Sequence, residues 1–156
     1  MASITIEETI IVISTIIATS ILAAAVFSGL SRIEASYKSI VTVTEEKVKT
    51  DIKIIFAVNT SPSTVKVWIK NVGTSRIPSQ MIASSDIFFG RVGNFERLSY
   101  NANWTYSIVN DDNDGVWESG ETIEITISLS YTLSEGDYYI LFVLSNGKDA
   151  EYTFSV

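Results

Sequence analysis

The sequence predicts an N-terminal hydrophobic α-helix followed by an all-β antiparallel sandwich of immunoglobulin-like layout. Residues 9–31 contain no charged side chain and are mostly apolar, which is typical of a helix in a membrane or a filament core. The rest of the chain contains a series of short runs of alternating apolar and polar residues, separated by turn residues. No helical period separates these runs, and this favours a sandwich over an α/β fold.

The apolar run 9–31 is long enough to cross a bilayer. About 23 residues at 1.5 Å each give a helix of about 35 Å, against a hydrocarbon core of about 30 Å. Thr5 and Glu8 have the spacing of a capping box, and Glu7 also suits the positive end of the helix dipole. We expect the helix to be retained, because a secretory signal would carry Lys or Arg before its apolar run.

Small residues recur four apart along this helix. Thr15, Thr19 and Ala23 form one row, and Ala25 and Gly29 form another. Such rows let helix backbones approach closely and predict self-assembly. The alternative is that small residues are simply frequent in membrane helices.

The charges around the helix and the glycosylation sequons disagree on its orientation. Arg32 and Lys38 follow the helix and no basic residue precedes it, so the positive-inside rule predicts a cytoplasmic C-terminal domain. Sequons at Asn59 and Asn103 are candidate glycosylation sites and favour an external domain.

Residues 1–36 are expected to form the helix and a short polar stem, and residues 37–156 the β-sandwich domain. The turn signals are clearest at residues 61–63 and 146–147, where Ser-Pro-Ser and Asn-Gly occur. The expected strands are residues 39–44, 51–59, 64–72, 85–89, 96–100, 104–109, 121–131, 137–144 and 151–156.

One acidic segment has the spacing of a twelve-residue calcium loop. Gly115 falls at its sixth position, where such loops turn sharply. Its oxygen ligands would suit a structural Ca²⁺, which is a hard cation. The alternative is an acidic hairpin loop, because tight turns also favour Asp, Asn and Gly. The candidate ligands are Asn110, Asp112, Asp114, Val116 through its carbonyl, Glu118 and Glu121.

Composition excludes several other functions. The chain has 156 residues, a formal net charge of −7, no Cys and no His. Disulfides, Cys/His zinc sites and Ser-His-Asp or Cys-His catalysis are therefore excluded. The acidic surface and the lack of a basic cluster exclude nucleic-acid binding. We expect no enzyme activity and no cofactor beyond the calcium ion.

Most aromatic side chains are expected in the sandwich core. Trp68 differs, because it falls on the polar face of the alternating run 64–72. It is the candidate for an exposed contact with a partner.

The layout and several short segments resemble a known family. The segments that carry the resemblance are residues 67–73, 88–90, 114–121, 136–139 and 152–154. Together with the N-terminal helix, they resemble the archaellum accessory proteins of the FlaG and FlaF type, within the archaeal type IV pilin-like superfamily. FlaG is favoured over FlaF on the overall pattern.

The resemblance implies a structural part of the archaeal motility machinery that assembles through its helix into a filament or stator complex of the cell envelope. Its β domain would lie outside the cell, with a FlaF-like protein and the surface layer as partners. Glu7 and Glu8 stand near the place where pilins carry an acidic residue that meets a neighbouring N-terminus. Flagellins and pilins are made with a basic leader, and the absence of such a leader here disfavours a filament subunit. A filament subunit is therefore kept as an alternative, and a membrane-anchored adhesion module is another.

Overall fold

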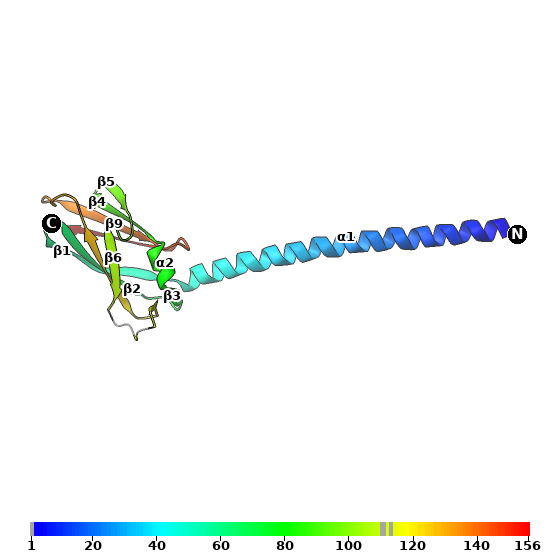
Figure 1. The fold of residues 1–156 in the computed structure, drawn as a ribbon, viewed down its shortest axis with the longest axis horizontal. Helices are drawn as coiled ribbons and strands as arrows, with labels where there is room; N and C mark the ends of the chain where they lie inside the picture. Colours follow the sequence, from blue (N-terminus) through cyan, green and yellow to red (C-terminus); the bar gives the residue numbers. More distant parts are fainter. Residues whose placement is uncertain (1, 110–111, 113) are drawn as a thin grey trace. The chain divides into compact units, whose positions relative to one another are not determined.

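The computed structural model describes residues 2–109, 112 and 114–156, and the side chains from Thr5 onward (Figure 1). The chain divides into two compact units, Met1–Thr42 and Val43–Val156. The first consists of helix alone. The second contains the end of that helix and all of the strands.

Helix α1 (Ala2–Lys49) is 48 residues long and continues well beyond the apolar run. The predicted strand at residues 39–44 is therefore wrong, and the helix passes residue 36, where the β domain was expected to begin. The β-branched residues 40–44 suggested a strand, but in the structure they continue α1. The hydroxyl of Thr42 donates to the Lys38 carbonyl at 3.0 Å, and Lys49 forms an ion pair with Glu45 one turn away at 2.5 Å.

Among the residues that the structure describes, the segment Thr5–Lys49 is the one helix long and apolar enough to cross a membrane. None of its most apolar window is buried within the chain itself. Large side chains such as Ile11, Leu22 and Phe27 are each more than half exposed.

The second unit contains two four-stranded antiparallel sheets and a short two-stranded one. The first sheet has the order β1 (Ile52–Ser61), β2 (Thr64–Asn71), β8 (Thr122–Ser128) and β6 (Trp104–Ile108). The second has the order β10 (Asp149–Ser155), β9 (Asp137–Val143), β4 (Asp86–Arg91) and β5 (Asn94–Leu98). The short sheet pairs β3 (Ile77–Pro78) with β7 (Val116–Trp117), and helix α2 (Ser79–Ala83) follows β3. These paired antiparallel sheets confirm the predicted sandwich.

The alternation predicted for the strands determines the core. In β2, Val65, Val67 and Ile69 are buried while the residues between them are partly exposed. Their cross-strand partners in β8 are Ile127, Ile125 and Ile123, which are also buried. Full burial of one such side chain contributes roughly 1.5–3 kcal/mol. The second sheet completes the core with Ile87, Phe89, Ile140 and Phe142.

Candidate interaction surfaces

The last turn of α1 is fastened to the sandwich by backbone hydrogen bonds. Thr74 and Ser75 donate their backbone N–H groups to the carbonyl of Lys49 at 2.9 and 3.2 Å. Val72 and Gly73 donate to the carbonyl of Asp51 at 2.8 and 2.9 Å. Terminal helix carbonyls usually need partners from outside the helix, and the loop after β2 supplies them here. Residues 43–49 consequently belong to the sandwich unit.

Two side chains from the loop between β9 and β10 also contact the joint between α1 and the sandwich, at Thr50 and Asp51. The amide of Asn146, in the loop between β9 and β10, donates to the hydroxyl of Thr50 at 3.1 Å. The ammonium of Lys148 lies 2.9 Å from a carboxylate oxygen of Asp51. Thr50 itself is buried, and its backbone N–H donates to the carbonyl of Glu46, four residues back, at 2.9 Å. The last turn of α1 and the sandwich thus form a bonded joint within the second unit.

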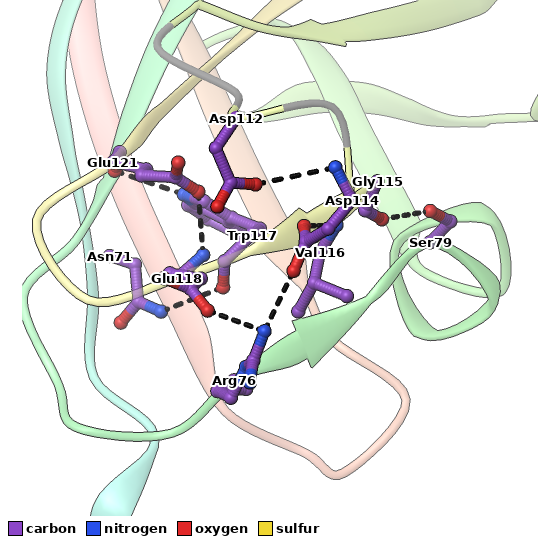
Figure 2. A network of polar contacts seen from close by, with 10 residues as sticks. All are labelled: Asn71, Arg76, Ser79, Asp112, Asp114, Gly115, Val116, Trp117, Glu118 and Glu121. Carbon is purple, nitrogen blue, oxygen red and sulfur yellow. Dashed lines mark hydrogen bonds and ion pairs between the residues drawn. The ribbon is translucent and has the colours of Figure 1, made fainter.

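Arg76 contacts the acidic loop predicted as a calcium site from one side (Figure 2). The Arg76 guanidinium lies 2.7 Å from Asp114 and 2.5 Å from Glu118, so one cation joins two of the predicted ligands. Arg76 precedes β3 and the acidic residues flank β7, and the pairing of β3 with β7 brings them together. This arginine was not among the residues predicted from sequence, because it lies far from the loop along the chain.

The remaining described oxygen groups of this loop mostly serve the loop itself. Asp112 accepts the backbone N–H of Asp114 at 3.3 Å, Asp114 accepts that of Val116 at 2.8 Å, and Glu121 accepts that of Glu118 at 2.7 Å. Within the described part of the chain, no three His, Cys, Asp or Glu residues form a metal-binding group. Asn110 lies outside the described residues, so the calcium site stays a prediction.

Trp68 lies half-buried on the outer face of the first sheet. Its ring centroid is 5.7 Å from that of Phe56, and 51 % of Phe56 is exposed. Beside them, Lys66 and Glu124 form an ion pair at 2.6 Å. Trp68 and Phe56 form a small aromatic surface, whereas Trp104 and Trp117 are buried in the core.

A second apolar surface lies at the β4–β5 hairpin, which the sequence did not indicate. Val92 and Phe95 are 62 % and 51 % exposed. Phe95 also helps to line a cleft of about 340 Å³, together with Tyr131 and Tyr138. Nearby, Tyr139 donates a hydrogen bond to Glu151 at 2.7 Å, which raises the pKa of Tyr139 to about 12.

The two predicted sequons differ in their surroundings. Asn59 is exposed near the end of β1. Asn103 is half-buried, and its side-chain oxygen accepts the backbone N–H of Ser99 at 3.2 Å. Glycosylation at either position stays a prediction.

The predicted helix-packing residues are all exposed on α1. Thr15 and Thr19 turn their hydroxyls back to the helix carbonyls of Ile11 and Thr15, at 2.7 and 2.8 Å. These hydroxyls are therefore satisfied within the helix, and the row with Ala23 presents small, mainly apolar groups. Around Gly29, an added Cβ would meet nothing within 4 Å. Ala25, Glu7 and Glu8 are likewise exposed.

Three comparisons with known proteins were informative. The family model for archaeal-type flagellin matches residues 2–154. An uncharacterized protein of Archaeoglobus fulgidus is 32 % identical over 161 residues, which cover 99 % of each chain.

Two solved structures match about two thirds of the chain. The archaellum periplasmic stator protein FlaG from Sulfolobus acidocaldarius is 31 % identical, with a TM-score of 0.59, over 67 % of this chain and 99 % of that chain. The stator complex of FlaF and FlaG from the same organism gives 30 % identity and a TM-score of 0.58, over 66 % and 87 %. These matches confirm the resemblance and the fold that the sequence predicted.

Proposed function

Because this chain belongs to the archaeal-type flagellin family, we propose that it is a non-enzymatic, FlaG-like structural component of the archaellum. The observation that carries the proposal is the match of two thirds of this chain to a FlaG stator protein at 31 % identity. Helix α1 contains an apolar run long enough to cross a membrane, and this run adds a means of attachment to the cell envelope.

The proposed arrangement places α1 in the membrane or a filament core and the sandwich outside the cytoplasmic membrane. A solved relative is described as periplasmic, which supports this orientation over the one suggested by Arg32 and Lys38. The bonded joint at Lys49–Asp51 suits a stator, because it fastens the last turn of α1 to the sandwich.

The proposed partners are further copies of this chain, a FlaF-like protein and the surface layer. The FlaF–FlaG complex among the matches supports a FlaF-like partner. The exposed aromatic surface of Trp68 and Phe56 is a candidate contact on the sandwich. The small-residue row on α1 is the candidate contact between copies.

Co-purification tests the stator proposal. The full-length chain and the FlaF-like protein of the same organism are expressed together and isolated in mild detergent through a tag on one of them. A stable complex is expected, and loss of swimming is expected when the gene is deleted from its host. Normal swimming of the deletion strain would contradict an archaellum function.

A filament subunit is the second candidate, favoured by the family match that includes the helix. Electron microscopy after detergent removal separates the two. Ordered filaments of the chain alone would favour the subunit, whereas dispersed particles that bind the FlaF-like protein would favour the stator. Monomers that bind neither a further copy nor the FlaF-like protein would favour the membrane-anchored adhesion module.

A further inference from the structure

The cleft beside the β4–β5 hairpin lies at the end of the sandwich that is remote from the joint with α1. It forms where the loop between β8 and β9, residues 129–136, passes next to the hairpin. Arg91 at the end of β4 pairs with Tyr138 at the start of β9, whereas the far end of β9 leads into the Asn146 loop that contacts the joint. The cleft also lies beside β5, which is the last strand of its sheet.

The lining of this cleft combines aromatic rings with polar side chains. Phe89 and Tyr138 are buried, and they stack with their ring centroids 5.6 Å apart, so they form the floor. Tyr131, from the loop, is 42 % exposed. Burial and the Glu96 carboxylate raise the pKa of Tyr131, which agrees with Glu96 facing it across the cleft. The polar side chains of the lining are Arg91, Asn94, Glu96, Thr132 and Ser134.

Hydrogen bonds hold the loop side of the cleft in place. The hydroxyl of Tyr138 accepts the backbone N–H of Ser134 at 3.1 Å and donates to the Ser134 carbonyl at 3.0 Å. The Arg91 guanidinium donates to the carbonyl of Glu135, and Leu133 is buried in the core. The cleft is therefore preformed, which lowers the conformational entropy that binding of a ligand must offset.

Three polar side chains of the cleft are available to a ligand. Asn94, Glu96 and Thr132 are exposed, and no hydrogen bond or ion pair joins their side chains to another described residue. An amide and a hydroxyl both donate and accept, whereas a carboxylate accepts. Glu96 and Arg91 also balance each other in charge. A ligand with a net charge would therefore meet a like charge on one side of the cleft, and a neutral ligand would not.

We propose that this cleft binds a neutral sugar residue. A sugar ring has an apolar C–H face, which can pack on the ring of Tyr131, and hydroxyl groups around its rim that both donate and accept hydrogen bonds. The volume of about 340 Å³ is near the lower end of ligand sites, which span about 300–1,000 Å³, so no more than about two rings fit. The inference goes beyond the proposed function and does not depend on it.

Titration with free saccharides tests the proposal. The full-length protein is kept in a detergent without a sugar headgroup, because such a headgroup would compete for the cleft. Glucose, galactose, mannose, N-acetylglucosamine and their disaccharides are added at millimolar concentration and followed by saturation-transfer NMR and isothermal titration. At least one of them is expected to bind more tightly than glucuronic acid and glucosamine, which carry a charge. No binding of any neutral saccharide, or tighter binding of a charged one, would overturn the proposal.

Side-chain variants test whether the saccharide binds in this cleft. Tyr131→Ala and Glu96→Gln should each weaken binding of the best saccharide about fivefold or more. Phe56→Ala is the matched control, because Phe56 is a 51 % exposed aromatic residue on the other sheet, and its affinity should be unchanged. Unfolding midpoints measured by circular dichroism check that each variant is folded. Equal affinities of the two cleft variants, the control and the unaltered protein would overturn the proposal.

The same saccharide coupled to albumin distinguishes the source of the sugar. Tighter binding to the conjugate than to the free saccharide would assign the cleft to glycans attached to another molecule. Binding of the free saccharide alone would assign it to soluble sugars. Both results require the loss of binding in Tyr131→Ala, and binding of the conjugate that survives this substitution would contradict the site.

Discussion

The side chain of Asn71 is fully buried and its oxygen accepts the backbone N–H of Gly73 at 3.1 Å. The amide nitrogen of Asn71 donates to the carbonyls of Ser75 and Trp117 at 2.8 and 3.1 Å. Gly73 and Ser75 in turn donate to the carbonyls of Asp51 and Lys49, where the helix meets the sandwich. One buried amide thus shapes the loop that receives the helix end.

Replacing Asn71 is expected to destabilise the sandwich strongly. Asn71→Ala removes the hydrogen bonds that its amide donates to the carbonyls of Ser75 and Trp117, and a buried group left without its partner costs about 1–3 kcal/mol. Thermal unfolding of the full-length protein in detergent, followed by circular dichroism, measures the change. Asn94→Ala, at an exposed position in β5, is the matched control and is expected to leave the midpoint unchanged. Equal midpoints for the two variants would contradict this account of the joint.

Gly73→Ala is expected to disrupt the joint by a direct clash. A Cβ at this position would lie 2.4 Å from both the Asp51 nitrogen and the Lys49 oxygen, which are backbone atoms that cannot rotate away. Overpacking of this kind costs typically about 1–3 kcal/mol. Limited proteolysis near residue 50, together with the unfolding midpoint, reports the damage. Gly29→Ala meets open space and serves as the control for proteolysis near residue 50; a harmless Gly73→Ala would show that the loop can shift.

The two buried tryptophans and Trp68 are expected to behave differently. Trp104 is 1 % exposed, and truncating it to Ala should cost about 3–5 kcal/mol of unfolding free energy. Trp68→Ala removes a half-buried ring on the outer face and should cost less, while weakening the complex with the FlaF-like partner. Urea unfolding and co-purification measure the two effects. Unchanged co-purification of Trp68→Ala would remove it from the partner surface.

Calcium is expected to stabilise the acidic loop, and Arg76 should compete with it. Arg76 neutralises Asp114 and Glu118, so Arg76→Ala should increase the rise in unfolding midpoint caused by millimolar Ca²⁺. Without calcium the same substitution should cost under about 1 kcal/mol, because Arg76 is largely exposed. Isothermal titration gives the affinity, with Mg²⁺ as the control ion. No heat and no change in midpoint for either protein would refute the calcium site.

Stability is expected to fall at alkaline pH through Tyr139. The Glu151 carboxylate accepts a hydrogen bond from its neutral phenol and holds its pKa at about 12 in the folded protein. An unfolded tyrosine has a pKa of about 10, so this contribution is complete below about pH 10 and is lost as pH rises toward 12. Absorbance of tyrosinate during a pH titration should show a late step that Tyr139→Phe removes. Glu151→Gln should move that step to lower pH, and an unmoved step would assign it to another tyrosine.

The sequence alone was sufficient for the class of each half of the chain. The charge-free run 9–31 predicted the helix, and the alternation of Val65, Val67 and Ile69 predicted a half-buried strand whose inner face the structure confirms. Both patterns reflect the fixed periods of helix and strand, which local sequence records directly. The stretch 39–44 was misassigned because β-branched residues at helical spacing fit both periods over so short a run.

Tertiary structure alone decided which distant residues meet. The pairing of β3 with β7 brings Arg76 to Asp114 and Glu118, and the loop after β2 brings Gly73 to the end of α1. Periodicity reports the face on which a side chain lies, but contacts between segments depend on strand order and register. Those follow from how both sheets bury their apolar faces together, which is a property of the whole domain and not of any short segment.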